Sequence, residues 1–495
     1  MVMRSAFFKE LRRYSGDEIA SLLQIKEEEA ITLIRKLKSL SIVKEKSKKT
    51  SRADEIVEDT DTEILDVNYK DKNSFFIFDF IGVINIGNYV IKCYPKYFSD
   101  VNIPLDKMQQ ILQVLRRYNS REQLLISASG DDESAEFNLL AITLFFIDDY
   151  AEYGTYSNPI EINELNGEGE INWDKTIGET YPLLSNNKTI YAELYTHGSL
   201  EDELDYFKQL HTCIITQCFI KLKELGLTEL FDIEEVILYD GELSDFGDED
   251  YILYRLSREL TVQFQSRKQI VLKTMYNYIS QGKLYEQENG LSLFGTNSFN
   301  LVWEKVCSEV FNNLINTKLK HLSLPQPLAE QYFDEKDNTL LGLIEKPRWN
   351  RIEDGRLIKS HRVEETLIPD IISFFSKDGE ECFGIFDAKY YNIHLNERRV
   401  AGQPGIGDIT KQYLYQLAYN DFINAHNFTR IQNAFLLPTE EDTGEYLGTA
   451  ELGVLSSMSA PALRDISVVK LPAQKMFKWY LAGRKIDINA VFPFL

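Results

Sequence analysis

The sequence predicts a multidomain protein that combines α+β and α/β architecture. At 495 residues the chain exceeds what one ordinary hydrophobic core holds, so it should divide into several domains. It is 44% hydrophobic and 12% aromatic, which is typical of a folded chain. Strand-like and helix-like patterns alternate along it. We therefore expect an N-terminal winged-helix-like module at 1–52, a mixed α/β domain at 53–290 and a C-terminal α/β domain at 291–495.

The charge of the chain is unevenly distributed. Its net charge is −23, yet residues 1–52 hold 13 Lys and Arg against 7 Asp and Glu, so the remainder carries −29. An acidic chain can still bind nucleic acid where basic residues gather locally. The acidic body also suits a subunit that docks on a protein partner.

The five cysteines lack the CxxC spacing of a zinc or redox motif. They are typical of buried or free thiols in a reducing cytoplasm. No apolar run reaches the roughly 18 residues of a membrane span, and no signal peptide is visible. We expect a cytoplasmic protein without a membrane partner.

The N-terminal segment is predicted to run helix, helix, strand. Ser5–Tyr14 has a short amphipathic pattern, Glu18–Leu23 follows a turn, and a longer helix opens at Lys26. A β-like exit begins at Ser41. In such a winged-helix pattern the longer helix could enter a major groove. The alternative is a protein contact, because the glutamates at 27–29 would repel phosphates.

The middle of the chain mixes both kinds of element. Residues 53–66 are acidic and suggest a linker, and Phe75–Tyr94 suits two strands and a turn. The GxG within Glu164–Trp173 lacks the third glycine and the helix of a dinucleotide fold, which indicates a loop. Helices are expected at Lys107–Tyr118, Glu136–Tyr153, Asp202–Leu225 and Ser257–Tyr278.

The C-terminal region carries a candidate acidic hairpin. A helix is expected over Ser298–Asn313. Two strand-like runs follow, Thr366–Phe375 and Cys382–Lys389, separated by a turn at Ser376–Gly379. The first run contains Asp370 and the second Asp387, so pairing of the strands can bring the two carboxylates side by side.

Such a hairpin has a chemical meaning. Hydrolysis of a phosphodiester needs a cation such as Mg²⁺ to neutralise developing charge, and Mg²⁺ prefers a few carboxylate oxygens plus water. Asp370, Asp387 and the Ala388 carbonyl could supply these ligands, with Glu304 as a third carboxylate and Mn²⁺ able to replace Mg²⁺. Lys389, two residues after Asp387, points to the same face and could orient the attacking water.

The alternative is that this D-x-K sequence marks an ordinary solvated strand. Asp387 interrupts an apolar run, however, and a buried unpaired carboxylate is costly. This cost favours the catalytic interpretation of the hairpin.

A helix over Asp408–Ala425 follows the hairpin. It places Gln412, Tyr415, Gln416 and Tyr419 on one face. Tyrosines on such a stripe need no function, but buried glutamine amides need partners. The glutamines could fix the catalytic strand or reach the DNA backbone, with Lys411 nearby.

A loose basic cluster upstream could hold phosphates. Its members are Lys346, Arg348, Arg351, Arg356, Lys359 and Arg362. Equally, they form half of a mixed-charge surface, because acids alternate with them. These acids are Glu353, Asp354, Glu364 and Glu365.

Several motifs stand out as a group: VWEKVC (Val302–Cys307), IPDII (Ile368–Ile372), FDAKYY (Phe386–Tyr391), PGIGDITKQYLYQLAY (Pro404–Tyr419), IKCYPKY (Ile91–Tyr97) and NGEGEINWDKTI (Asn166–Ile177). Together they resemble the LlaJI family of restriction endonucleases, relatives of McrC, the nuclease partner of the GTP-driven motor McrB. The resemblance spans most of the chain.

The resemblance implies a PD-(D/E)xK restriction-endonuclease-like domain at the C-terminus. Asp370, Asp387 and Lys389 would be its nuclease residues, and Glu304 would match the helix glutamate common in the superfamily. Tyr415 and Gln416 would match the helix motif after the lysine. This sequence has Asp rather than Glu at the second acidic position, which the family tolerates.

The resemblance also implies partners. Double-stranded DNA would be the substrate, cleaved in a GTP-dependent restriction system that defends against phage. The domain at 53–290 would dock on a McrB-like AAA+ GTPase, and the chain itself, lacking a GxxxxGK[ST] loop, should bind no nucleotide. Two alternatives stay open: a repair or recombination nuclease without a GTPase, and a winged-helix scaffold whose acidic hairpin is structural.

Overall fold

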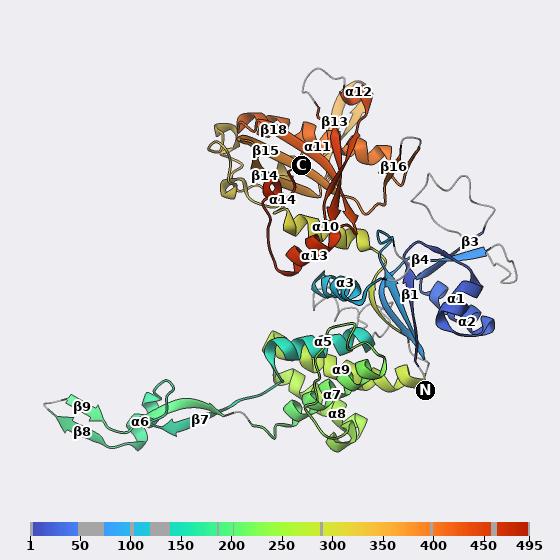
Figure 1. The fold of residues 1–495 in the computed structure, drawn as a ribbon. Helices are drawn as coiled ribbons and strands as arrows, with labels where there is room; N and C mark the ends of the chain where they lie inside the picture. Colours follow the sequence, from blue (N-terminus) through green and yellow to red (C-terminus); the bar gives the residue numbers. More distant parts are fainter. Residues whose placement is uncertain are drawn as a thin grey trace. The chain divides into compact units, whose positions relative to one another are not determined.

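The computed structural model describes residues 3–47, 74–99, 103–118, 139–185, 188–200, 202–287, 291–396, 399–456 and 463–493. It forms two compact units (Figure 1). The first comprises Ile84–Asn88 and Ser120–Phe294, and the second Val2–Val83, Tyr89–Asn119 and Gly295–Leu495. The predicted linker at 53–66 lies outside the described residues. Among the described helices, none is both long and apolar enough to cross a membrane.

The N-terminal part of the second unit begins with strands rather than a helix. Its elements are β1 (Arg4–Lys9), β2 (Arg13–Tyr14), α1 (Gly16–Leu23), α2 (Glu27–Ser39), β3 (Val43–Ser47) and β4 (Ser74–Phe78). The helix predicted for Ser5–Tyr14 is therefore wrong. Ala6 and Phe8 are buried in alternation, and β1 pairs in parallel with β6 (Tyr89–Tyr94), so tertiary pairing decides the conformation.

Two sheets contain the N-terminal strands. One has the order β2-β4-β3, and the other the order β1-β6-β5-β11, with β5 at Ile81–Ile86 and β11 at Leu291–Thr296. The segment 75–94 thus holds three strands, not the two expected. Helix α3 (Leu105–Tyr118) follows, close to the predicted bounds.

Helices dominate the first unit. They are α5 (Leu139–Tyr153), α7 (Tyr206–Glu224), α8 (Glu249–Val262) and α9 (Ser266–Gln287). The single helix predicted over Ser257–Tyr278 is two helices. Gln263 explains the break, because its Oε1 accepts the amide hydrogens of Phe264 and Gln265, each at 3.1 Å, in place of helical bonds.

An arm of short elements interrupts these helices and extends away from them (Figure 1). It contains β7 (Ile160–Leu165), α6 (Trp173–Glu179), β8 (Pro182–Ser185), β9 (Lys188–Tyr191) and β10 (Tyr195–Leu200). The GxG segment is a loop, as predicted. A Cβ at Gly169 would lie 1.8 Å from the carbonyl oxygen of His197, so the close approach of β10 requires glycine there.

The C-terminal part of the second unit is built on a five-stranded sheet with the order β14-β15-β18-β20-β19. Strands β15, β18 and β20 run parallel, and β14 and β19 pair antiparallel at the edges. The bounds are β14 (Ile371–Lys377), β15 (Glu380–Ala388), β18 (Arg430–Thr439), β19 (Glu445–Ala450) and β20 (Ile466–Pro472). The predicted hairpin is confirmed as β14–β15.

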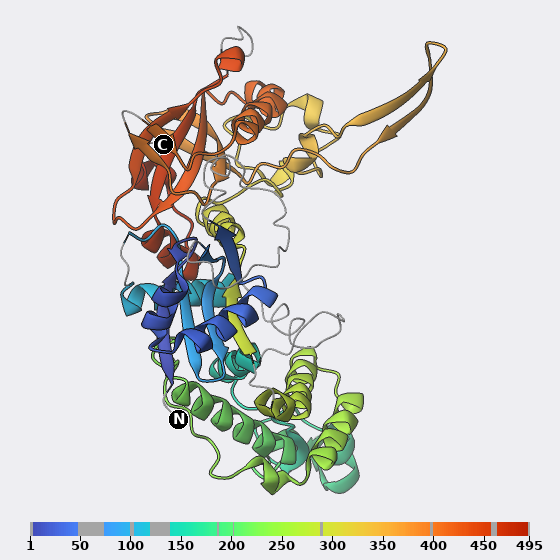
Figure 2. The same cartoon turned by 90° about the vertical axis from the view of Figure 1, so that its right-hand side faces the viewer.

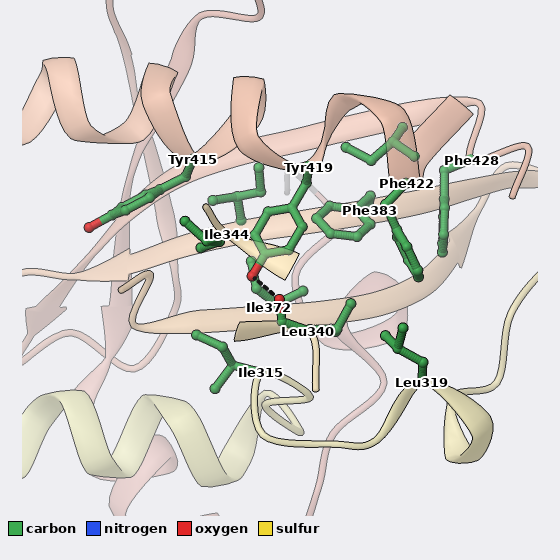
Figure 3. Packing of buried hydrophobic residues seen from close by; sticks show 12 residues of the cluster. Ile315, Leu319, Leu340, Ile344, Ile372, Phe383, Tyr415, Tyr419, Phe422 and Phe428 are labelled. Atoms are coloured by element: carbon green, nitrogen blue, oxygen red, sulfur yellow. Dashed lines mark hydrogen bonds between the residues drawn. The ribbon is translucent and has the colours of Figure 1, made fainter. Parts of the chain in front are cut away.

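Helix α11 (Ile406–Ala425) covers one face of this sheet. Its residues Tyr415, Tyr419 and Phe422 pack with Phe383 of β15 in one buried cluster, where the Tyr419 hydroxyl donates to the Leu340 carbonyl at 3.1 Å (Figure 3). On a strand, alternate residues share a face, so Asp387 lies on the same side as Phe383, toward α11.

The remaining elements of this part are α10 (Phe299–Val310), β12 (Arg348–Glu353), β13 (Arg356–Arg362), β16 (His394–Asn396), β17 (Arg399–Ala401), α12 (Gly453–Ser456), α13 (Ala473–Leu481) and α14 (Ile488–Val491). All five cysteines are buried and free, as predicted. The mixed α/β architecture is confirmed as well.

Candidate functional site

The pairing of β14 with β15 brings Asp370, Asp387 and Lys389 together. Ile371 lies opposite Phe386, which sets Asp370 at the end of β14 beside Asp387. Asp387 is only 3% exposed, and its Oδ1 lies 3.0 Å from the Nζ of Lys389. The Ala388 amide donates to the Oδ2 of Asp370 at 3.0 Å. The predicted triad therefore converges at one end of β15.

The carboxylates of this group shift the pKa values of Asp370 and Lys389. Burial raises the pKa of Asp370, and the neighbouring Asp387 charge raises it further. Burial alone would lower the pKa of Lys389, but the carboxylates of Asp387 and Asp408 outweigh it and raise that pKa. The buried Asp387 and the partly buried Asp370 lie side by side, and of these two only Asp387 pairs directly with the Lys389 ammonium, so additional positive charge at this point would be favourable.

The donor set fits a small divalent cation. Mg²⁺ usually takes one or two protein carboxylates and completes its octahedral shell with water and phosphate oxygens. Asp370 and Asp387 are such carboxylates, adjacent and largely withdrawn from solvent. In the part of the chain that the structure describes, no three His, Cys, Asp or Glu side chains form a group that could hold a metal ion.

Glu304 approaches the group from helix α10. Burial raises its pKa, while Lys389 lowers it and Asp387 raises it, so the three residues lie within electrostatic reach. Its neighbour Trp303 is fully buried and donates its indole N–H to the carbonyl of Leu436 at 3.0 Å. The Lys389 amide donates to that same carbonyl at 3.0 Å. Trp303 thus ties α10 to the strand backbone beside Lys389.

Sequence reasoning missed Asp408 as a site residue. Its Oδ1 lies 3.1 Å from the Nζ of Lys389, and its Oδ2 accepts the Gly405 amide hydrogen at 3.0 Å at the start of α11. The available signal was its place at the start of the helix predicted over Asp408–Ala425. Asp408 is thus a second carboxylate, besides Asp387, that pairs with the lysine.

Asn313 is a second residue that the sequence did not reveal. Its Nδ2 donates to the Asp370 carbonyl at 2.7 Å, and its Oδ1 accepts the Ile372 amide at 3.0 Å. A single amide thus clamps the backbone on both sides of Ile371. These two hydrogen bonds fix the backbone at the start of β14, directly after Asp370.

The predicted site residues on α11 differ in burial and in their hydrogen-bond partners. Gln416 accepts the Arg464 amide on its Oε1 at 3.1 Å, and the Tyr415 hydroxyl donates to the Ile368 carbonyl at 3.0 Å. Gln412 is fully buried, and neither atom of its amide has a partner among the described residues. Lys411 is exposed. These contacts favour a supporting role for Gln416 and Tyr419 over direct contact with DNA.

The IKCYPKY motif also reaches this region. The Lys96 amide donates to the Tyr390 hydroxyl at 3.2 Å and to the Oε2 of Glu10 at 3.0 Å. The Tyr390 hydroxyl in turn donates to Glu10 at 2.5 Å. Glu10, Lys96 and Tyr390 thus form a buried network directly after the candidate lysine.

Comparison with known proteins gives the class of protein. A profile of the LlaJI restriction endonuclease family matches residues 80–330 and 327–474. The chain belongs to this family and is therefore an endonuclease component of a restriction system, as the motifs predicted.

Two kinds of relative are similar to it. The Type II restriction enzyme BsuMI component YdjA of Bacillus subtilis (strain 168) is 28% identical over 441 residues, which cover 86% of this chain and 85% of that protein. The second kind is solved structures from Thermococcus gammatolerans. A McrB AAA+ hexamer assembly with bound McrC matches at a TM-score of 0.36 and 14% identity, over 97% of this chain and 99% of that chain. The McrBC complex from the same organism matches at a TM-score of 0.20 and 14% identity, over 55% of this chain and 79% of that chain.

Proposed function

We propose that the chain is the metal-dependent nuclease subunit of a GTP-dependent restriction system, with Asp370, Asp387 and Lys389 as its catalytic residues and Glu304 as a further acidic residue within electrostatic reach of them. The observation that carries this proposal is the convergence of a buried carboxylate, Asp387, a partly buried one, Asp370, and a lysine at one end of β15. Membership of a restriction endonuclease family supports it and weighs against a repair nuclease or a scaffold.

Each residue has a role in this proposal. Asp370, Asp387 and the Ala388 carbonyl would hold Mg²⁺, which when bound neutralises charge on the phosphate oxygens and eases ionisation of water. Lys389 orients the attacking water and stabilises negative charge as the phosphodiester reacts. Its ammonium stays protonated because Asp387 and Asp408 flank it.

The test is cleavage of plasmid DNA with Mg²⁺ by single variants of the full-length chain, assayed with its AAA+ partner. Asp387→Asn, Asp370→Asn and Lys389→Ala should each lower the rate at least about 100-fold. A matched control is Asp378→Asn, which removes the same charge from the exposed turn of the same hairpin. Asn also tolerates the positive φ of 53° at that position. Wild-type cleavage by all three site variants would contradict the assignment.

The proposed partner is a McrB-like AAA+ GTPase that engages the first unit. Support comes from the arm, which exposes large apolar side chains, including Tyr181 at 92% and Leu184 at 82%. Leu183, between them, is exposed as well, and adjacent apolar side chains in solvent are typical of interaction surfaces. We expect Tyr181→Ser with Leu184→Ser to abolish co-purification with the GTPase and stimulation of its GTP hydrolysis. Retention of both would contradict docking through the arm.

A further inference from the structure

The basic cluster noted in the sequence lies on a two-stranded ribbon. Strand β12 pairs antiparallel with β13, and every residue of both strands is exposed. Figure 2 shows this ribbon (gold) extending away from the five-stranded sheet of the same unit. Because both of its faces meet solvent, the ribbon contributes little to a core, and its composition needs another explanation.

Its cations face one another across the strands. Arg348 lies opposite Arg362, and Arg351 lies opposite Lys359. Like charges placed directly opposite destabilise an antiparallel pair. From 348 to 362 the ribbon holds five Lys and Arg against two acids, within a chain of net charge −23. Such an arrangement becomes favourable when an anion lies across it.

The acids sit at the two ends of the ribbon rather than along it. Glu353 ends β12 and Asp354 lies in the turn that follows, and Glu345 and Glu364 lie at the base. They do pair with cations: Arg351 with Glu353, Lys346 with Glu364, and Arg348 with Glu345 at 3.4 Å. These pairs are exposed and therefore weak, so a polyanion can displace them.

One face of the ribbon combines cations with an aromatic residue. Trp349 lies opposite His361, next to the Arg351 and Lys359 pair, and alternation places these four side chains on one face. Trp349 is 71% exposed. Basic groups interleaved with an exposed aromatic ring suit nucleic acid, and a two-stranded ribbon fits the roughly 12 Å width of the major groove.

A short segment of chain connects the base of the ribbon to the candidate site. The Val363 amide donates to the Pro347 carbonyl at 3.0 Å and closes the base of the hairpin. The Thr366 hydroxyl donates to the Glu345 carbonyl at 3.2 Å. Eight positions separate Arg362 from Asp370, a span of at most about 29 Å. Together with the bond from Tyr415 to the Ile368 carbonyl, these contacts fix the connection from ribbon to carboxylate.

We propose that the β12–β13 ribbon binds the duplex beside the phosphodiester that is cleaved, with the face of Trp349, Arg351, Lys359 and His361 against the DNA. The inference rests on the nuclease function proposed above. Because phosphate contacts position a protein without reading bases, the ribbon orients the duplex across Asp387 and Lys389 and does not select the sequence.

The test measures DNA binding by the full-length chain carrying Asp387→Asn, which keeps the duplex uncut. Fluorescence polarisation of a duplex of about 40 bp is followed from about 25 to 200 mM salt. Adding Arg351→Gln and Lys359→Gln should make the slope of log K against log salt shallower by about 1.8, because two phosphate contacts are lost. Affinity near 0.1 M salt should fall roughly 10- to 100-fold. The matched control is Lys475→Gln with Lys478→Gln, two exposed lysines of α13.

A second measurement follows Trp349 itself. Titration with duplex DNA should quench tryptophan fluorescence of the parent protein, and Trp349→Phe should remove most of that change. Thermal unfolding of all variants should match the parent, because the substituted residues are exposed.

Different results would contradict the DNA-binding role of the ribbon and the proposed nuclease site. Unchanged affinity and salt slope in the Arg351 and Lys359 variant, or no binding by the parent at the lowest salt, would overturn the role of the ribbon while the cleavage assay still reports on the site. Normal DNA binding with loss of the AAA+ partner would show a protein contact and overturn it too. Wild-type cleavage by Asp387→Asn would overturn the nuclease site instead.

Discussion

Replacing Asp408 with asparagine is the sharpest test of how the site holds its lysine. Asp408 touches Lys389 at 3.1 Å and acts through it, so it is a positioning residue. Asparagine keeps an oxygen that can accept the Gly405 amide, which preserves the helix cap, but it removes the charge. The substitution therefore separates the electrostatic contribution of Asp408 from its local structural one.

The expected loss of kcat in Asp408→Asn follows from the contact between Asp408 and Lys389. A hydrogen bond to a charged group contributes about 1.5–3 kcal/mol. The side chains of Lys389 and Asp408 are 21% and 22% exposed, so solvent screens this pair only in part. If the contact acts fully in the transition state, kcat should fall roughly 10- to 150-fold. Asp387 still holds the ammonium, so the loss should be smaller than that of Lys389→Ala.

The pH dependence distinguishes this role from a structural one. Asp408 helps to raise the pKa of Lys389, so its neutralisation lowers that pKa. The protonated lysine is then lost at a lower pH, and the alkaline limb of the rate profile moves toward neutrality. Single-turnover cleavage from pH 7 upward measures both effects. The control is Asp421→Asn, an exposed position of the same helix.

Wild-type kcat together with an unmoved alkaline limb in Asp408→Asn would refute this reasoning. A lower rate with an unmoved limb would show that the Asp408 charge affects cleavage without setting the pKa of Lys389. Either result would leave Asp387 as the one carboxylate that matters to Lys389.

Two further predictions concern stability. Burial raises the pKa of Glu10 to about 6 from 4.5, so the folded state gains stability below pH 4.5 and loses it as pH rises through 6, by about 2 kcal/mol. Glu10→Gln, which can still accept from Tyr390, should thus have a higher melting temperature than wild type at pH 7.5 and a shrinking advantage at pH 5.5; an advantage independent of pH would contradict this. Trp303→Phe should cost about 1–3 kcal/mol in denaturant unfolding, because it leaves the Leu436 carbonyl with one donor fewer. An unchanged unfolding midpoint would show that the indole N–H adds nothing.

The sequence by itself determined the local features of this protein. The turn at Ser376–Gly379 between two apolar runs predicted β14–β15, and the spacing of Asp387 and Lys389 predicted their shared face. The stripe on α11 predicted its buried side. These inferences succeeded because side-chain direction in strands and helices follows from short-range backbone geometry. The same reasoning failed at Ser5–Tyr14, where a short amphipathic pattern suits either element and pairing with β6 decides.

Only the tertiary structure decided which distant groups meet. The Glu10 contact with Tyr390 joins positions 380 apart, and no local pattern records such a pairing. In the sequence Asp408 was only the first residue of a predicted helix, and only the packing of α11 on β15 brings it to Lys389. Likewise, the sequence allowed the basic cluster to be half of a mixed-charge surface. Only the register of β12 with β13 shows that its cations lie opposite one another. Contacts of this kind depend on how elements pack and pair, and a one-residue change of register would move every side chain of a strand to the other face.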